Sequence, residues 1–283
     1  MRHRQNKVKR LMIIALTSLI GLGTGLTLGL VGLGGSVIAM PSLIYGLHIK
    51  FDDAVGIILL SVFVTALLGF ITQARQRQIP VRPGLIMSCA SLVTAPFGAL
   101  ICQSLTRFTG LMLFSMTLCI ISRIMWKRTD AKKTSLETLK TAWRASPLLQ
   151  KCLIGARPLI FFGAIGGFLM GLIGIGGGMI VVPTLLTFTN MKFNDAKVAS
   201  LVAIIGFSFS GLIGHFSQGN GIPLEYALPF ICACIIGFFS GNKLARHLPE
   251  KGLTKVFSVM TGIVAAGVII TEIIASYGHH FVG

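Results

Sequence analysis

Two clusters of closely spaced glycines lie deep within apolar sequence, and a proline follows each. The first is Gly32, Gly34 and Gly35 before Pro41, and the second is Gly174, Gly176, Gly177 and Gly178 before Pro183. Glycine and proline at such depth interrupt a helix and leave backbone N–H groups that need partners. The N-terminus of a half-helix offers several such donors and about half a positive charge, so it is a natural binding site for an anion.

We therefore expect four residues to break the helices: Gly32, Pro41, Gly174 and Pro183. The expected anion-binding groups are backbone N–H groups, supplied by Gly34, Gly35, Ser36, Gly176, Gly177 and Gly178. Ser36 adds a hydroxyl where the second cluster has Gly178. The alternative is that these glycines only allow helices to approach closely. A dinucleotide-binding or P-loop site is excluded because neither a preceding strand nor a Gly-Lys-Ser/Thr sequence is present.

The two clusters belong to an internal repeat. The segment GLVGLGGSVIAMP ending at Pro41 realigns with GLIGIGGGMIVVP ending at Pro183, an offset of 142 residues (183 − 41). Without any gap, this offset also pairs Asp53 with Asp195 and Gly69 with Gly211. The chain is therefore predicted to contain two related halves.

The apolar blocks predict the elements that position these clusters. With 53% hydrophobic and only 12% charged residues, the chain is predicted to be all-α and to cross a membrane several times. We divide it into a basic tail (1–10), a first repeat (11–126), a cytoplasmic basic linker with a short amphipathic helix (127–154), a second repeat (155–275) and a C-terminal tail (276–283). Each repeat is expected to hold a broken helical hairpin followed by three spans, near 54–73, 84–104 and 108–126 and near 196–216, 224–243 and 254–275.

The net charge of +17 reflects topology rather than nucleic-acid binding, because the basic residues lie between the apolar blocks. Basic connections at 75–82, 123–157 and 243–255 are all predicted to be cytoplasmic. This arrangement requires an odd number of crossings in each half, so the second half is expected to be inverted relative to the first. The basic N-terminal tail conflicts with a complete hairpin at 11–47, and the sequence leaves open whether 34–47 crosses fully.

Few other residues suggest chemistry. Ser208, Ser210 and His215 invite a serine-hydrolase interpretation, but their spacing on one helix is wrong for a nucleophile and its base, so we expect helix-packing roles and no enzyme. Asp53 and Asp195 precede spans in matching contexts, where a first-turn carboxylate is the simpler explanation than proton or sodium coupling. The six cysteines show no metal-ligand spacing, so neither a metal nor a cofactor is expected.

The polar groups expected inside the spans are neutral, apart from Glu272 near the end of the last one. They are Ser36, Ser61, Thr65, Ser91, Thr94, Ser200, Ser208 and Asn242. A cation transporter usually places carboxylates along its path, so this inventory favours an anionic or neutral substrate.

The glycine–proline element resembles that of the TauE/SafE family of membrane transporters, which is named for exporters of sulfite and sulfoacetate. The resemblance rests on Gly174–Pro183, on its counterpart Gly32–Pro41 and on the spans that follow each, so it covers about residues 11–275. It implies a multi-pass permease of the bacterial inner membrane that moves small sulfur-containing or other organic anions. Of the family's common Thr-Ser pair, only Ser200 matches in the second half, and the first half has Ile57 and Ile58 there.

The sequence thus predicts a secondary transporter that binds sulfite, an organosulfonate or a similar anion near the membrane midplane, with Ser200 as a side-chain donor. The expected partners are the anion and the lipid bilayer. A coupling proton or sodium ion and a homo-oligomer stay open. The alternatives are a passive anion channel and a membrane scaffold that acts through the basic linker.

Overall fold

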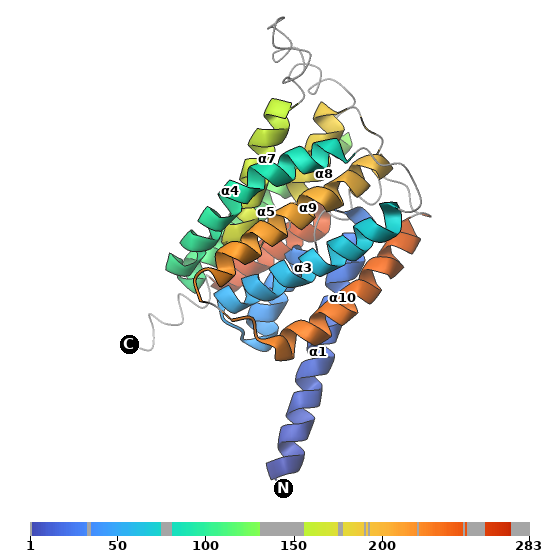
Figure 1. Ribbon diagram of the computed structural model, residues 1–283. Helices are drawn as coiled ribbons and strands as arrows, with labels where there is room; N and C mark the ends of the chain where they lie inside the picture. The colour runs from blue at the N-terminus through green and yellow to red at the C-terminus, as the bar shows by residue number, and fades with distance from the viewer. Residues whose placement is uncertain are drawn as a thin grey trace, which may run out of the picture.

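The computed structural model describes residues 2–32, 35–74, 81–130, 156–174, 178–189, 191, 193–219, 221–245, 247 and 258–272. Every regular element within these ranges is helical, and none of them contains a strand (Figure 1). The amphipathic helix expected in the linker falls outside the described residues. The all-helical class predicted from composition is confirmed.

The first half begins with a long helix and continues in shorter pieces before three more long helices. Its elements are α1 (Arg2–Val31), α2 (Ser36–Pro41), the π-helical turn η1 (Ser42–Gly46), α3 (Phe51–Ala74), α4 (Arg82–Ser104) and α5 (Arg107–Asp130). The N-terminal part of α1 extends beyond the rest of the bundle (Figure 1). Helix α3 begins a few residues before its apolar stretch because Asp52 and Asp53 occupy its first turn, where carboxylates are favourable.

The second half follows the same order. It comprises α7 (Ala156–Ile173), α8 (Gly178–Phe188), α9 (Phe193–Phe216), α10 (Leu224–Ala245) and a final helix over Ser258–Glu272. Six helices in the described part of the chain are long and apolar enough to cross a membrane: α1, α3, α4, α7, α9 and α10. The protein is therefore a multi-pass membrane protein.

Small residues join each long first helix to a helix of the other half. Gly21, Gly25 and Gly29 of α1 lie against the backbone of α10 at Phe230, Cys234 and Phe238. Gly163, Gly167 and Gly171 of α7 lie against α4 at Met87, Ser91 and Ala95. Glycines four residues apart form a continuous strip that lets two helix backbones approach closely. In each pair, the residue numbers of the contacting positions increase together along the two helices, so the two helices run parallel.

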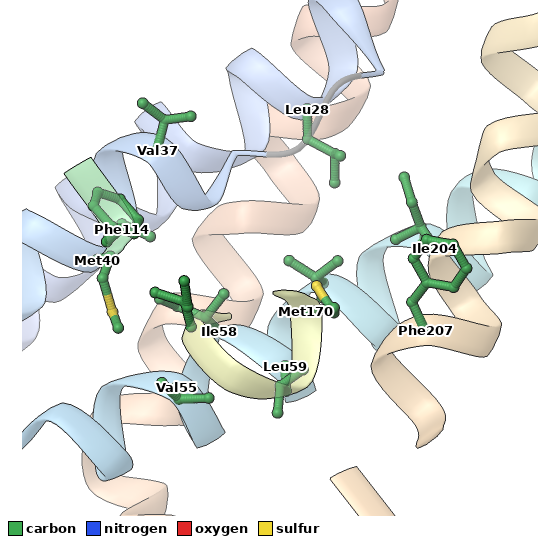
Figure 2. Packing of buried hydrophobic residues seen from close by; sticks show 14 of the residues in the cluster. Leu28, Val37, Met40, Val55, Ile58, Leu59, Phe114, Met170, Ile204 and Phe207 are labelled. Carbon is green, nitrogen blue, oxygen red and sulfur yellow. The ribbon is translucent and has the colours of Figure 1, made fainter. Parts of the chain in front are cut away.

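Helices α3 and α9 form the centre of the bundle. Their spans are 61% and 72% buried, whereas the spans of α1, α4, α7 and α10 are at most half buried. The two helices run antiparallel, since Gly56 of α3 lies against His215 of α9 and Leu59 lies against Gly211. Figure 2 shows part of the apolar cluster beside them, to which α2, α3 and α7 contribute Met40, Ile58 and Met170.

Helix α5 and the final helix are joined by a reciprocal pair of hydrogen bonds. The Ser122 hydroxyl donates to the Ser258 carbonyl and the Ser258 hydroxyl donates to the Ser122 carbonyl, each at 2.9 Å. The Tyr45 hydroxyl of η1 also donates to Glu272 Oε1 at 2.8 Å, so the acid that the sequence placed near the end of the last span is buried and hydrogen-bonded. These bonds tie the outer helices to both halves of the bundle.

Candidate functional site

The first glycine cluster ends α1 and turns the chain. Gly32 has φ +69°, a left-handed conformation that glycine adopts without steric cost, and its N–H donates to the Leu28 carbonyl at 2.9 Å. A Cβ atom built on Gly32 would lie 2.7 Å from Cγ of Lys197. The turn therefore combines two reasons for glycine: its backbone conformation and the side chain packed on it.

Lys197 is a buried cation at this turn. It comes from the second turn of α9, its side chain is 5% exposed, and its Nζ donates to the carbonyls of Gly29 and Leu30 and to Asn242 Oδ1. The C-terminus of a helix carries a partial negative charge and carbonyls without partners, so a cation there is stabilised. The end of α1 therefore holds Lys197 inside the protein, 168 residues away from Gly29 in sequence.

Ser200 lies one turn further along α9, on the same face as Lys197. Its hydroxyl lies 3.5 Å from the carbonyl oxygen of Gly32 and 2.7 Å from that of Lys197. Helix α9 thus delivers an ammonium group and a hydroxyl to the first break. The expectation that all polar groups inside the spans are neutral, apart from Glu272, is wrong because of Lys197.

The second glycine turn has nearly the same backbone conformation as the first, but its surroundings are apolar. Helix α7 ends at Ile173, Gly174 has φ +65°, and its N–H donates to the Met170 carbonyl at 3.0 Å. A Cβ on Gly174 would lie 3.6 Å from Val55 and 3.7 Å from Ile58 of α3. These two residues stand 142 positions before Lys197 and Ser200 (197 − 55, 200 − 58), so the repeat pairs a polar break with an apolar one.

The structure describes three of the six residues whose backbone N–H groups were expected to bind an anion. Gly35, Ser36 and Gly178 are buried at the starts of α2 and α8, and Gly35 packs so tightly on Thr24 that a Cβ would overlap its carbonyl oxygen. The start of α2 therefore lies two turns back along α1, within the interior of the bundle. Gly34, Gly176 and Gly177 lie outside the described residues.

The two glycine turns are not neighbours. Gly32 lies beside the start of α9 and Gly174 beside the start of α3, and these central helices run antiparallel. Lys197 and His215 therefore lie at opposite ends of α9, 18 residues and roughly 27 Å apart (215 − 197). Each turn docks on the first turns of the other half's central helix, so the two turns mark opposite ends of the bundle.

The two prolines differ in their effect on the helices that contain them. Pro41 is the last residue of α2, and the chain continues directly into η1, whose wider π-helical turns begin at Ser42. Pro183 lies within α8, which runs on to Phe188. A π-helical segment can re-satisfy carbonyls that lose their usual N–H partner to a proline. The α-helix therefore ends at the expected Pro41, whereas α8 continues through Pro183, and Gly32 and Gly174 directly follow the ends of α1 and α7.

The remaining candidates lie where the simpler explanations placed them. Asp53 and Asp195 are in the first turns of α3 and α9. Ser208 donates to the Ile204 carbonyl, and Ser210 donates to the Ser91 carbonyl of α4 at 3.1 Å. Both hydroxyls serve helix backbones, as expected of packing serines. Among the described residues, no group of three His, Cys, Asp or Glu side chains could hold a metal ion.

The family model for the sulfite exporter TauE/SafE matches residues 17–268, which include both glycine turns, Lys197 and Ser200. The chain belongs to the TauE/SafE family. The match covers both halves, so the resemblance noted at the glycine–proline element extends over nearly the whole chain.

Relatives of this TauE/SafE chain are named as membrane transporters. A probable membrane transporter protein of Xylella fastidiosa strain Temecula1 is 28% identical over 87% of this chain and 90% of its own length. YunE of Bacillus subtilis, a probable membrane transporter protein, is 25% identical over 89% and 94%. A probable membrane transporter protein of Methanocaldococcus jannaschii is 25% identical over 88% and 94%. No solved structure matches the chain.

Sequence reasoning missed Lys197 as a site residue of this TauE/SafE chain, although the repeat contained the signal. Aligning the halves at the offset of 142 sets Lys197 opposite Val55, a cation opposite an apolar residue in a predicted span. The predicted span near 196–216 places Lys197 at its boundary, whereas α9 already begins at Phe193. The earlier start of α9 places Lys197 in the second turn of the helix rather than among its first residues.

Proposed function

We propose that the protein is a secondary transporter of small anions in the bacterial cytoplasmic membrane, with sulfite and organosulfonates as the first substrates to test. The observation that carries this proposal is the buried ammonium of Lys197 at a helix break, within a family of membrane transporters. Ionisable side chains inside membrane proteins are costly and mark the paths of charged substrates. A cation in this place favours an anion over a metal ion or an organic cation.

The anion would bind where Lys197 and Ser200 meet the first glycine turn, together with the glycine-rich start of α2. Lys197 would exchange the carbonyls of Gly29 and Leu30 for the anion, which offers a full negative charge instead of partial ones. The backbone donors would come from the first cluster, at Gly34, Gly35 and Ser36. Gly176, Gly177 and Gly178 follow the Gly174 turn at the other end of the bundle, so they would serve that end when it opens. The burial of Gly35 and Ser36 two turns below the end of α1 supports a position near the membrane midplane.

Alternating access would follow from two inverted repeats. The support is the pairing of helices: α1 packs parallel to α10 and α7 packs parallel to α4, so corresponding helices of the two halves make corresponding contacts. The antiparallel α3 and α9 lie between them. Rocking of the halves about this central pair would open the two ends of the bundle in turn, exposing the Gly32 turn at one end and the Gly174 turn at the other.

The test is flux in proteoliposomes with sulfite, sulfoacetate, taurine and sulfate as separate probes. We expect wild-type protein to move at least one of these anions, and Lys197→Met to slow that flux at least about 10-fold, because losing one charge-assisted contact costs roughly 1.5–3 kcal/mol. The matched control is Lys243→Met, which removes an exposed lysine of α10. Size-exclusion chromatography checks that both variants fold.

Wild-type protein that moves none of the four probes contradicts the proposed substrate class. Folded Lys197→Met with the same flux as Lys243→Met contradicts the site. A third variant, Ser200→Ala, removes only the hydroxyl near Gly32, and we expect a smaller loss of flux from it than from Lys197→Met.

A further inference from the structure

A cluster of titratable side chains lies at the end of the bundle opposite to Lys197. It consists of Asp52 and Asp53 in the first turn of α3, Cys102 in the last turn of α4 and His215 in the last turn of α9. His215 is 4% exposed. The anion site proposed above uses none of these residues.

His215 is packed directly onto the backbone of α3. A Cβ atom built on Gly56 would lie 2.6 Å from Nε2 of His215 and 3.1 Å from Cε1, so glycine at position 56 makes room for the imidazole. Asp52 precedes Gly56 by four residues and Asp53 precedes it by three, which puts both carboxylates one turn away on the same helix face. Burial is the strongest influence on the imidazole and disfavours its charged form, and the two carboxylates oppose that effect.

The Nε2 atom of His215 is buried and has no hydrogen-bond partner in the described part of the chain. Buried polar atoms nearly always have partners, and an exception calls for an explanation. A neutral imidazole has one nitrogen that accepts a proton, and histidine is the side chain that changes charge between about pH 5 and 8. Protonation would turn His215 into a cation facing two carboxylates.

Cys102 within this cluster and Lys50 next to it are other ionisable groups. The Cys102 thiol donates to Asp52 Oδ1 at 3.5 Å, so α4 contributes a donor rather than a competing base. Lys50, just before α3, is exposed. On α9 itself, the last turn contains no other ionisable side chain.

The corresponding position in the first half cannot take up a proton. Gln73 stands 142 residues before His215 (215 − 73), and its side-chain Nε2 is likewise buried without a hydrogen-bond partner in the described residues. An amide is neutral at every physiological pH. The repeat thus pairs a titratable side chain, His215, with a non-titratable one, Gln73.

We propose that His215, facing Asp52 and Asp53, is a proton-binding site that couples proton movement to anion transport. The coupling rests on the transport function proposed above, whereas proton binding at His215 stands independently of it. Protonation draws the end of α9 towards the start of α3, and deprotonation removes that attraction. Because α3 and α9 join the two halves, the proton biases which end of the bundle opens.

The first test measures proton binding without any substrate. Protein with carbon-13-labelled histidine in lipid nanodiscs is titrated from pH 5 to 8 by NMR, and His215→Gln identifies the His215 signal by its loss. We expect this signal to shift with pH. A signal that stays constant from pH 5 to 8 overturns the proton site. His247→Gln, which removes an exposed histidine, is the matched control for the assignment.

The second test measures coupling as the number of protons moved per sulfoacetate ion, using a pH-sensitive dye inside proteoliposomes. Sulfoacetate is fully ionised near neutral pH, so it carries no protons of its own. We expect His215→Gln, which copies Gln73, to lower this ratio at least about 10-fold relative to wild type and to His247→Gln. An unchanged ratio overturns the coupling. Absence of sulfoacetate flux in wild type counts against the proposed substrate, and the NMR titration still decides the proton site.

Discussion

Gly32 and Lys197 show how one residue's environment decides its role. Gly32 and Gly174 have nearly the same backbone conformation. The side chain of Lys197 packs tightly on Gly32, whereas Gly174 lies at ordinary contact distance from Val55. The backbone turn is thus a property of each half, whereas the charge is supplied to only one of them. An asymmetric charge gives a symmetric scaffold a preferred binding end.

Gly32→Ala tests whether the turn also positions Lys197. The substitution forces an L-residue into a left-handed conformation, which costs roughly 1–2 kcal/mol, and it also displaces the lysine side chain. Gly219 has φ +77° with nothing within 4 Å of a built Cβ, so Gly219→Ala carries the backbone cost alone. We expect a clearly larger fall in melting temperature, measured in detergent, for Gly32→Ala than for Gly219→Ala. Equal falls would mean that the lysine contact does not stabilise the protein.

At the scale of elements, paired helices with glycine strips hold the two halves together. Lipid tails are as apolar as leucine, so helix association inside a membrane depends on close packing rather than on a hydrophobic driving force. The strips on α1 and α7 provide that packing against α10 and α4. Each half therefore needs the other to bury its first helix.

Gly25→Val should push α1 away from α10, because its Cβ would overlap the Cys234 carbonyl. Overpacking of this kind costs about 1–3 kcal/mol or more. Gly23, two residues earlier, has nothing within 4 Å, so Gly23→Val is the control for valine in this helix. We expect only Gly25→Val to lower the melting temperature and the yield of monodisperse protein. Similar behaviour of both variants would argue against the strip.

For the whole molecule, the helix directions decide the topology that the sequence left open. Helix α3 runs parallel to α10, since Gly69 lies against Phe238 and Thr65 interacts with Cys234, and α1 also runs parallel to α10. Helices α1 and α3 therefore run in the same direction, and the chain between them must return across the bundle. The segment that ends before α3 therefore crosses the bundle twice, once as α1 and once on the way back. Because α1 runs parallel to α10, the N-terminal tail lies on the side where α10 begins.

Cysteine labelling tests this topology. In a cysteine-free background, we expect Gln5→Cys to react with a membrane-impermeant maleimide added outside intact spheroplasts. Thr134→Cys, in the basic linker predicted to be cytoplasmic, should react only after permeabilisation. Labelling of both positions under the same condition would place the tail on the linker side and contradict the parallel packing of α1 with α10.

The sequence by itself determined the helical membrane class, the repeat and the two turns at Gly32 and Gly174. These properties follow from composition and local backbone preference: long apolar blocks must be helical in lipid, and glycine is the residue that turns a chain there. The same local reasoning failed at Pro183, because a helix interior can accommodate a proline. Local backbone preference alone does not show whether the surrounding helix can accommodate a proline.

The tertiary structure alone decided which side chains meet across the halves. Lys197 reaches carbonyls 168 and 167 residues away, and His215 packs on Gly56, because each half docks its helices on those of the other. A single sequence contains no contact information of that range, and a lysine near a predicted span start has the same pattern whether it faces water or a helix end. Burial against a specific partner turns Lys197 from a topology signal into a candidate ligand for an anion.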